Sequence, residues 1–219
     1  IEVKRVGCVG MCHQTPLLEL NLTDQPSTHY ARVQPDDVEQ IIQRHIQPRT
    51  WFERLHRRAA RSLENLVLDG VDQPETRYPL NVRDKPVAAF LGRQKHIATE
   101  HCGVLDPVDM EEYRRFDGFK AVEKCLREMT PERVITEIQQ SGLRGRGGAG
   151  FPTGQKWAIV RAAKGEQKYV ICNGDEGDPG AFMDRMILES YPFRVIEGMM
   201  IAAYAVAAHE GYFYIRAEY

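Results

Sequence analysis

The chain has 219 residues, enough for one large or two small domains, and its 42% apolar and 27% charged content is ordinary for a soluble globular protein. A formal net charge of −2 argues against broad attraction to nucleic acid or to a membrane surface, so we expect neither partner. No apolar run approaches the ~20 residues that a membrane-spanning helix needs, so direct membrane insertion is not expected.

Residues 1–47 predict a partial α/β segment. The chain opens at Ile1 with neither a Met nor a signal pattern, so we expect a piece of a longer protein. Short strands are expected over 3–7 and 17–22. A helix is expected to begin at Pro35-Asp36-Asp37, and its apolar face is formed by Val38, Ile41, Ile42 and Ile46.

Residues 48–100 predict a linker with one helix and an extended arm. Apolar residues recur at helical spacing from Trp51 to Val67, and arginines fill the other positions. A solvated basic face explains those arginines better than a phosphate site. Several prolines and charges over 70–87 indicate an arm that crosses a surface.

Residues 101–219 predict an α/β domain, because helices and strands alternate along them. Thr130-Pro131-Glu132 is a strong helix start, with an N-cap hydroxyl, a proline at the first position and an acid in the first turn. The expected helices cover 109–116, 118–129, 131–141, 156–163 and most of 183–208, and the expected strands cover 168–172 and 212–218.

The glycine-rich stretch from Gly142 to Trp157 carries the most chemistry. Its six glycines let a backbone turn through positive φ and approach a ligand closely. A helix follows, and the free N–H groups at a helix N-terminus suit a phosphate. Arg144, Arg146 and Lys156 add cationic donors.

Other interpretations of this loop fit less well. Gly145, Gly147 and Gly150 match the dinucleotide fingerprint, but that motif follows a strand, and a helix is expected here. The triphosphate P-loop fails because Lys156 lies two residues after Gly154. A mobile surface loop would not call for the aromatic residue and the proline that stand inside it.

A second loop follows the strand expected at 168–172. It carries one amide, Asn173, and three acids, Asp175, Glu176 and Asp178. Loops at the carboxyl ends of strands are where α/β sheets place ligands. These acids could accept hydrogen bonds from ribose hydroxyls or a flavin ring, or they could bind Mg²⁺ or Ca²⁺, and spacing alone leaves both open.

Together these stretches resemble one family. Gly142-Leu-Arg-Gly-Arg-Gly-Gly-Ala-Gly-Phe-Pro-Thr-Gly154, then Lys156-Trp157, then Cys172-Asn-Gly-Asp-Glu-Gly-Asp-Pro-Gly180, are similar to the FMN-binding, NADH-oxidising 51 kDa-type subunit of complex I. The same subunit type occurs in NAD-linked hydrogenases and formate dehydrogenases. The resemblance runs from about Asp106 to the end, and it implies a Rossmann-like FMN-binding domain over 101–219.

The resemblance also implies roles for individual residues. Phe151 would stack on the nucleotide, and Asp178 and Glu218 would lie near its ribose and favour NADH over NADPH. The family commonly has Glu at position 178 and an aromatic ring at Ile159. No catalytic side chain is expected, because the cofactor supplies the reactive atoms. The residues implied to hold FMN are Gly145, Arg146, Gly147, Gly148, Lys156, Asn173, Asp175, Glu176, Tyr214 and Glu218.

Cys8 and Cys12 are separated by three residues near the start of the chain. Alone, such a pair could be structural or half of a zinc site. Beside the flavin domain, residues 1–47 resemble the second half of a thioredoxin-like [2Fe–2S] module, which implies that both cysteines bind a [2Fe–2S] cluster in the complete parent protein. The five cysteines are odd in number and form a poor disulfide framework, which predicts a cytoplasmic location, free or on the cytoplasmic side of a membrane complex.

The leading hypothesis is an electron-entry module that transfers hydride between NADH and FMN and passes electrons to iron–sulfur clusters in partner subunits. The first alternative is the same module reducing NAD⁺ in a hydrogenase, formate dehydrogenase or bifurcating complex, which the fused thioredoxin-like segment favours. The second alternative is an assembly fragment that binds no flavin.

Overall fold

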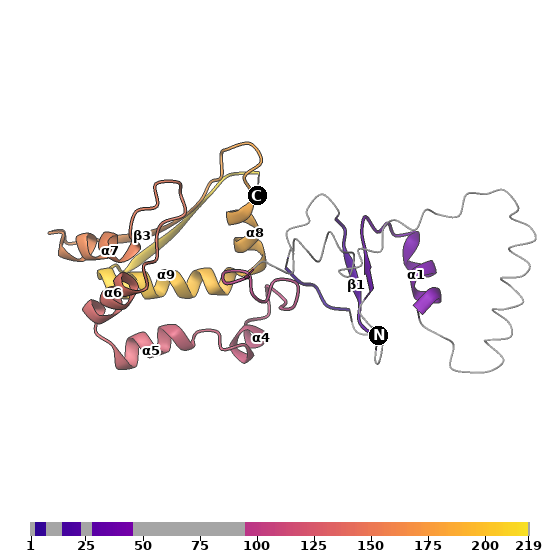
Figure 1. Ribbon diagram of the computed structural model, residues 1–219, viewed down its shortest axis with the longest axis horizontal. Helices are drawn as coiled ribbons and strands as arrows, with labels where there is room; N and C mark the ends of the chain where they lie inside the picture. Colours follow the sequence, from indigo (N-terminus) through magenta and orange to yellow (C-terminus); the bar gives the residue numbers. More distant parts are fainter. Residues whose placement is uncertain (1–2, 8–14, 23–27, 46–94, 219) are drawn as a thin grey trace, which may run out of the picture. The chain divides into compact units, whose positions relative to one another are not determined.

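The computed structural model describes residues 3–7, 15–22, 28–45 and 95–218 (Figure 1). The chain divides into two compact units. One consists of residues 1–10 together with 96–219, and the other covers 11–95. The flavin-type motifs all lie in the first unit, which is described in most detail below.

The described part of the unit 11–95 is a small α/β arrangement. Strand β1 (Leu18–Leu20) pairs antiparallel with β2 (Thr28–Tyr30), with Leu18 opposite Tyr30. Helix α1 (Asp37–His45) has acids in its first turn and bases in its last, as the helix dipole favours. The Tyr30 hydroxyl lies 2.6 Å from His45 Nε2 and ties the sheet to the end of α1. The expected strand at 17–22 and the helix from 37 are therefore confirmed, and β2 was not predicted.

Three helices precede the glycine loop. Asp109 accepts a hydrogen bond from Glu112 N and begins α4 (Met110–Arg115), and α5 (Lys120–Glu128) follows. Helix α6 (Pro131–Gln140) begins as predicted, with Thr130 Oγ1 accepting from Arg133 N. Gly142 follows its end with a φ of +69°, a left-handed conformation that favours glycine.

The remainder forms a parallel strand pair joined through helices. Strand β3 (Tyr169–Gly174) pairs in parallel with β4 (Glu210–Ile215), and the crossover between them holds α8 (Met183–Ser190) and α9 (Pro192–Val206). Helix α7 (Thr153–Ala162) lies between the glycine loop and β3. A parallel pair with a helical crossover confirms the predicted α/β class.

Helix α9 organises this unit because it packs against α5, α6, α7, α8 and both strands (Figure 1). The apolar cluster around it contains the fully buried Ala205. Small residues on α9 let neighbouring helices approach, and larger side chains from α5, α6 and α7 fill the space around them. The other members of the cluster are Cys125, Met129, Val134 and Ile135, with Trp157, Ala158, Ile201 and Tyr204 against them.

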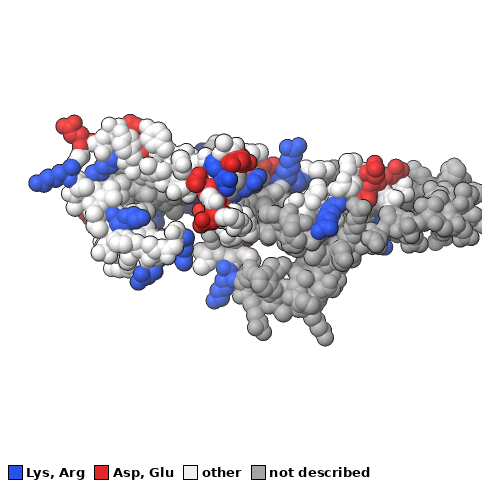
Figure 2. Space-filling model, turned by 90° about the horizontal axis from the view of Figure 1, so that it is seen from above, with Lys and Arg blue, Asp and Glu red and all other residues white. Residues whose placement is uncertain are grey.

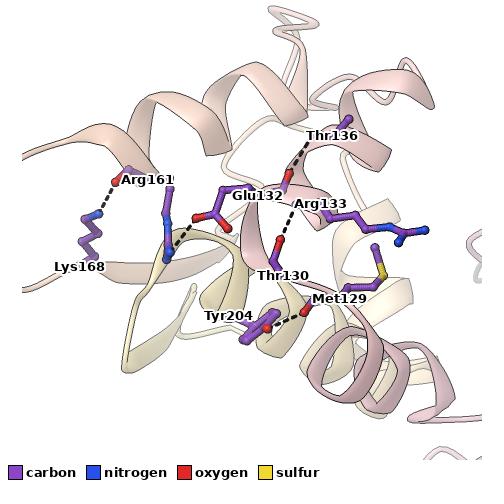
Figure 3. Close-up of polar contacts among 8 residues, drawn as sticks. All are labelled: Met129, Thr130, Glu132, Arg133, Thr136, Arg161, Lys168 and Tyr204. Carbon is purple, nitrogen blue, oxygen red and sulfur yellow. Dashed lines mark hydrogen bonds and ion pairs between the residues drawn. The ribbon is translucent and has the colours of Figure 1, made fainter.

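Polar contacts fasten the elements around this cluster (Figure 3). The Tyr204 hydroxyl on α9 donates to the carbonyl of Met129 at 2.7 Å, just before α6. Arg161 on α7 pairs with Glu132 on α6 at 2.9 Å. Lys168 Nζ donates to the Arg161 carbonyl at 2.8 Å, which ties the end of α7 to the start of β3. The glycine loop is therefore bounded by helices that are held both by apolar packing and by hydrogen bonds.

The helical structure expected over most of 183–208 is confirmed, as two helices that are divided at Tyr191, because Pro192 cannot donate the N–H that would continue α8 and instead begins α9. One expectation about secondary structure was wrong. The strand expected at 3–7 forms no strand. Gly7 is buried against Ser190, where an added Cβ would clash, and Lys4 pairs with Glu112. That segment is held by packing and an ion pair rather than by a strand partner.

The linker helix and arm expected over 48–94, and Cys8 and Cys12, lie outside the described residues. Within the described ranges, no helix has the length and apolar character needed to cross a membrane.

Candidate functional site

The glycine loop is closed at its base by backbone hydrogen bonds. Thr153 N donates to Leu143 O at 2.9 Å, and Gly145 N donates to Phe151 O at 2.9 Å. Arg144 Nη1 donates to Gly150 O at 3.0 Å and braces the turn from within. Residues 146–150 therefore form a bend between α6 and α7, and the hydrogen bonds hold the base of this bend in place.

The bend needs glycine for its backbone conformation and leaves space around it. Gly148 has a φ of +101° and Gly150 a φ of +62°, both in the left-handed region. A Cβ added at Gly147, Gly148 or Gly150 would meet no protein atom within 4 Å. These glycines are therefore not explained by packing within the described protein, which fits a backbone that receives a ligand.

The loop leads directly into α7. Pro152 stands at the N-cap of α7, and no side chain accepts a hydrogen bond from that end of the helix. An N-terminus without a side-chain cap keeps its partial positive charge available to an anion. Lys156 lies one turn into α7 and, like Arg146, is exposed. These features match the phosphate-binding role that the sequence predicted.

Gly154 has a separate, structural role. A Cβ at this position would lie 2.6 Å from both the Cγ and the backbone N of Gln139. Glycine here allows α7 to pass close to α6, so this glycine serves packing and not ligand approach.

The second loop begins at the carboxyl end of β3. Asn173 Oδ1 accepts a hydrogen bond from Asp175 N at 3.1 Å, which forms a tight local turn. Asn173 stands opposite Tyr214 of β4 in the parallel register, so the ends of the two strands bring these predicted flavin contacts side by side. Asp178 is exposed further along the loop.

Glu176 has a role that the sequence did not predict. Its carboxylate accepts hydrogen bonds from Asp184 N at 2.7 Å and Arg185 N at 3.0 Å, at the start of α8. Its own φ is +44°, in the left-handed region. Burial raises the pKa of Asp184, and the Glu176 carboxylate raises it further. Glu176 thus serves as the cap of α8, in addition to any contact with a ligand.

Arg216 was missed by sequence reasoning and connects the two strand ends. Its Nε and Nη2 atoms lie 3.0 and 3.1 Å from the two carboxylate oxygens of Glu218, a bidentate pair. Its Nη1 donates to the carbonyl of Glu176 at 3.2 Å. The hydrogen bond from Arg216 lowers the pKa of Glu218 to about 2. Arg216 follows β4, and Glu218 lies in the turn after it, so the pair forms where the chain leaves the strand.

The remaining predictions divide between exposed residues and residues outside the described ranges. Phe151 is exposed, as a stacking ring must be before a nucleotide binds. Cys8 and Cys12 lie outside the described residues, so the structure leaves their ligand role open. In the parts of the chain that the structure describes, no three His, Cys, Asp or Glu side chains gather as a metal site, so nothing there supports a metal at Asp175, Glu176 and Asp178.

The distribution of charge on the surface indicates that a phosphate would be recognised by a few nearby side chains and not by a broad basic surface. Figure 2 shows acidic and basic side chains intermingled on one face of the described protein, with no extended area of a single sign. A nucleotide phosphate would therefore be recognised by the loop geometry and by nearby arginine and lysine side chains, and not by a broad basic surface.

Comparison with known proteins finds relatives of the segment that contains both loops. Residues 138–219, which include both loops and both strand ends, match the family described as the Nuo51 FMN-binding domain. The NADP-reducing hydrogenase subunit HndC of Solidesulfovibrio fructosivorans is 51% identical over 127 residues, which are 58% of this chain and 26% of that protein. An NADH-quinone oxidoreductase subunit of Rhizobium meliloti is 50% identical over 107 residues, 49% of this chain and 25% of that protein.

A third relative matches almost the whole chain. The NAD-reducing hydrogenase HoxS subunit alpha of Cupriavidus necator is 36% identical over 212 residues, which are 97% of this chain and 30% of that protein. The chain therefore spans between a quarter and a third of the length of these relatives. Residues 138–219 thus match the Nuo51 FMN-binding family, and the chain is similar to proteins named as subunits of NADH-quinone oxidoreductases and of NAD- or NADP-reducing hydrogenases.

Proposed function

We propose that this chain, within a longer protein, forms part of an electron-entry module that binds FMN and NAD(H) and transfers hydride between them. The observation that carries the proposal is the glycine bend, whose left-handed Gly148 and open surroundings lead into a helix N-terminus without a side-chain cap. This geometry fits the phosphate and the edge of a flavin nucleotide, in a segment that matches an FMN-binding family.

Different residues would bind different parts of FMN. The bend around Gly147 and Gly148, with Arg146 and Lys156, would hold the phosphate. The strand ends at Asn173 and Tyr214 would bind the rest of the flavin. When bound, FMN supplies the chemistry that accepts two electrons as hydride and releases them singly. The protein contributes orientation, since its residues fix where nicotinamide and flavin meet.

On the nucleotide side, Phe151 would provide a face for stacking, and Asp178 and Glu218 would accept hydrogen bonds from ribose hydroxyls. Electrons would then pass to iron–sulfur clusters in partner subunits, as the resemblance implies. The three cysteines of the described ranges, Cys102, Cys125 and Cys172, form no disulfide with one another. That state fits the cytoplasmic location that we propose.

One observation favours the hydrogenase-type arrangement, in which the module can reduce NAD⁺. The match to the HoxS alpha subunit covers 97% of this chain, whereas the match to the Rhizobium meliloti oxidoreductase covers 49%. The N-terminal segment and the flavin domain thus occur together in a hydrogenase subunit. We therefore propose a NAD-linked hydrogenase or a related multi-subunit oxidoreductase as the parent complex.

The test is cofactor analysis of the purified parent protein, followed by activity. We expect FMN bound at about one per protomer, and reduction of an artificial acceptor such as ferricyanide by NADH. A colourless protein that cannot be reconstituted with FMN would favour the assembly-fragment alternative. Bound FMN without oxidation of NADH or NADPH would contradict the nucleotide part of the proposal.

A separate prediction concerns Cys8 and Cys12. In the intact parent protein, either Cys→Ser change should remove a [2Fe–2S] EPR signal and about two irons per protomer, because a hydroxyl is a poor ligand for the cluster. FMN content should stay unchanged, since neither residue belongs to the glycine loop. Cys125→Ser is the matched control and should leave both iron and FMN in place, because Cys125 lies in the apolar core between α5 and α9. An unaltered EPR spectrum in both Cys8 and Cys12 variants would show that they are not ligands.

A further inference from the structure

Arg216 stands at the junction of two parts of the candidate nucleotide site. It follows β4 directly, and its guanidinium holds Glu218 through two hydrogen bonds at 3.0 and 3.1 Å. The remaining nitrogen reaches the carbonyl of Glu176, 40 positions away in sequence, at 3.2 Å. One side chain therefore joins the end of β4 to the loop that carries Asp178.

The Glu176 end of this connection is itself well held. The Glu176 carboxylate accepts from the backbone N atoms of Asp184 and Arg185, which fixes the peptide whose carbonyl Arg216 contacts. The Arg216 side chain is about one-third exposed, whereas that of Glu218 is two-thirds exposed. The guanidinium is thus held on one side by the Glu176 carbonyl, in a loop that is itself fixed by hydrogen bonds. On its more exposed side it pairs with the Glu218 carboxylate.

This pairing changes how nucleotide selection must work. An acid beside the ribose is expected to repel the 2′-phosphate of NADP(H) by like charge. Here the Glu218 charge is compensated by a bidentate arginine, so the pair presents little net negative charge. The same guanidinium has the planar, forked donors that suit a phosphate. Repulsion by Glu218 alone is therefore an incomplete account.

We propose that Arg216 determines nucleotide specificity, because Glu218 occupies a guanidinium that would otherwise bind the 2′-phosphate of NADP(H). This inference rests on the proposed function, since it concerns the same nucleotide site. Glu218 then selects NAD(H) chiefly by pairing with Arg216. When the Glu218 carboxylate is replaced by a neutral group, Arg216 can bind the 2′-phosphate of NADP(H). Proteins named as NAD-reducing and as NADP-reducing hydrogenase subunits are both similar to this chain, so nucleotide choice differs among proteins that share much of its sequence.

The test is a double-mutant cycle in the complete enzyme with FMN bound. In Glu218→Gln, a neutral amide replaces the carboxylate partner of Arg216, and kcat/KM for NADPH should rise at least about tenfold, the scale of a charge-assisted hydrogen bond to phosphate. In Glu218→Gln combined with Arg216→Gln, that gain should fall to less than about threefold. Glu218→Gln combined with Arg216→Lys should recover part of it, because lysine keeps the charge but loses the fork.

A binding measurement separates specificity from a structural effect. Affinity for 2′,5′-ADP should rise in Glu218→Gln and return toward the wild-type value in the double variant, while affinity for 5′-ADP, which lacks the 2′-phosphate, should rise in neither. Arg161→Gln is the matched control: this arginine pairs with Glu132 on α6, outside the site, and its loss should leave the NADPH to NADH ratio unchanged. Asp178→Asn should raise the ratio more weakly than Glu218→Gln.

The outcomes are distinguishable. If the NADPH gain survives in the double variant with FMN retained, Glu218 acts by direct repulsion and the role of Arg216 is wrong. If the Arg216→Gln double variant loses FMN, the double variant with Arg216→Lys is measured instead. A rise in kcat/KM for NADPH and in 2′,5′-ADP affinity equal to that of Glu218→Gln alone would then contradict the need for the forked guanidinium. If the wild-type enzyme holds FMN and oxidises neither nucleotide, the proposed function itself fails.

Discussion

Gly148→Val should reduce bound FMN at least about tenfold, because a β-branched residue at a φ of +101° is strained by well over the ~1–2 kcal/mol that a left-handed conformation costs an ordinary residue. The added side chain meets no protein atom within 4 Å, so the fold should tolerate it while the loop changes conformation. The measurement is FMN per protomer, by absorbance and by release on denaturation, in the purified parent protein.

Two variants sharpen this test. Gly147 is not in the left-handed region and is equally open, so Gly147→Val should lose FMN only by blocking the approach of the ligand to the backbone. Gly165, in the exposed loop after α7, also has room and no left-handed φ, and Gly165→Val should keep FMN. Stoichiometric FMN in both the Gly147 and Gly148 variants would show that the flavin binds elsewhere.

The largest effect on stability is expected at Glu197. This buried carboxylate on α9 accepts hydrogen bonds from the Tyr113 hydroxyl at 2.5 Å and from the backbone N atoms of Phe119, Ala121 and Val122 at 2.9–3.1 Å. It therefore caps the N-terminus of α5, which has no side-chain cap of its own. Burial, with the adjacent carboxylate, raises the pKa of Tyr113, so the hydroxyl remains a donor at neutral pH.

Glu197→Ala leaves several buried donors without an acceptor, and each such group costs about 1–3 kcal/mol. We expect a net loss of about 3 kcal/mol after partial hydration, which lowers Tm by roughly 6–12 °C at about 2–4 °C per kcal/mol for a domain of this size. Glu197→Gln keeps one acceptor oxygen and should lose less. The measurement is Tm, with hydrogen–deuterium exchange of the peptide over 119–122.

Glu123→Ala is the control, since Glu123 also belongs to α5 but is exposed and pairs with Arg127 at the surface. Its loss should cost less than about 0.5 kcal/mol. Equal Tm values for the Glu197→Ala and Glu123→Ala variants, with unchanged exchange over 119–122, would show that the buried carboxylate does not stabilise α5.

Local sequence determined much of this protein. Thr130-Pro131-Glu132 specified the start of α6, and Gly142 specified the turn after it, because caps and left-handed glycines act within a few residues. The glycine bend can be recognised for the same reason, because glycines close together in the sequence specify its backbone conformation. The alternation of helices and strands was enough for the α/β class.

Tertiary structure decided the contacts that join distant segments. The cap of α5 comes from Glu197, 75 to 84 positions from its donors, and Arg216 reaches Glu176 across the whole crossover. Neither pairing leaves a periodic pattern in the sequence, because it depends on how α9 and the β3–β4 pair pack. The acids of the second loop showed the same limit: their types indicated a polar site, but only packing assigned Glu176 to the start of α8. Residue type is a local property, whereas the partner of a charged side chain is set by the fold that brings the two together.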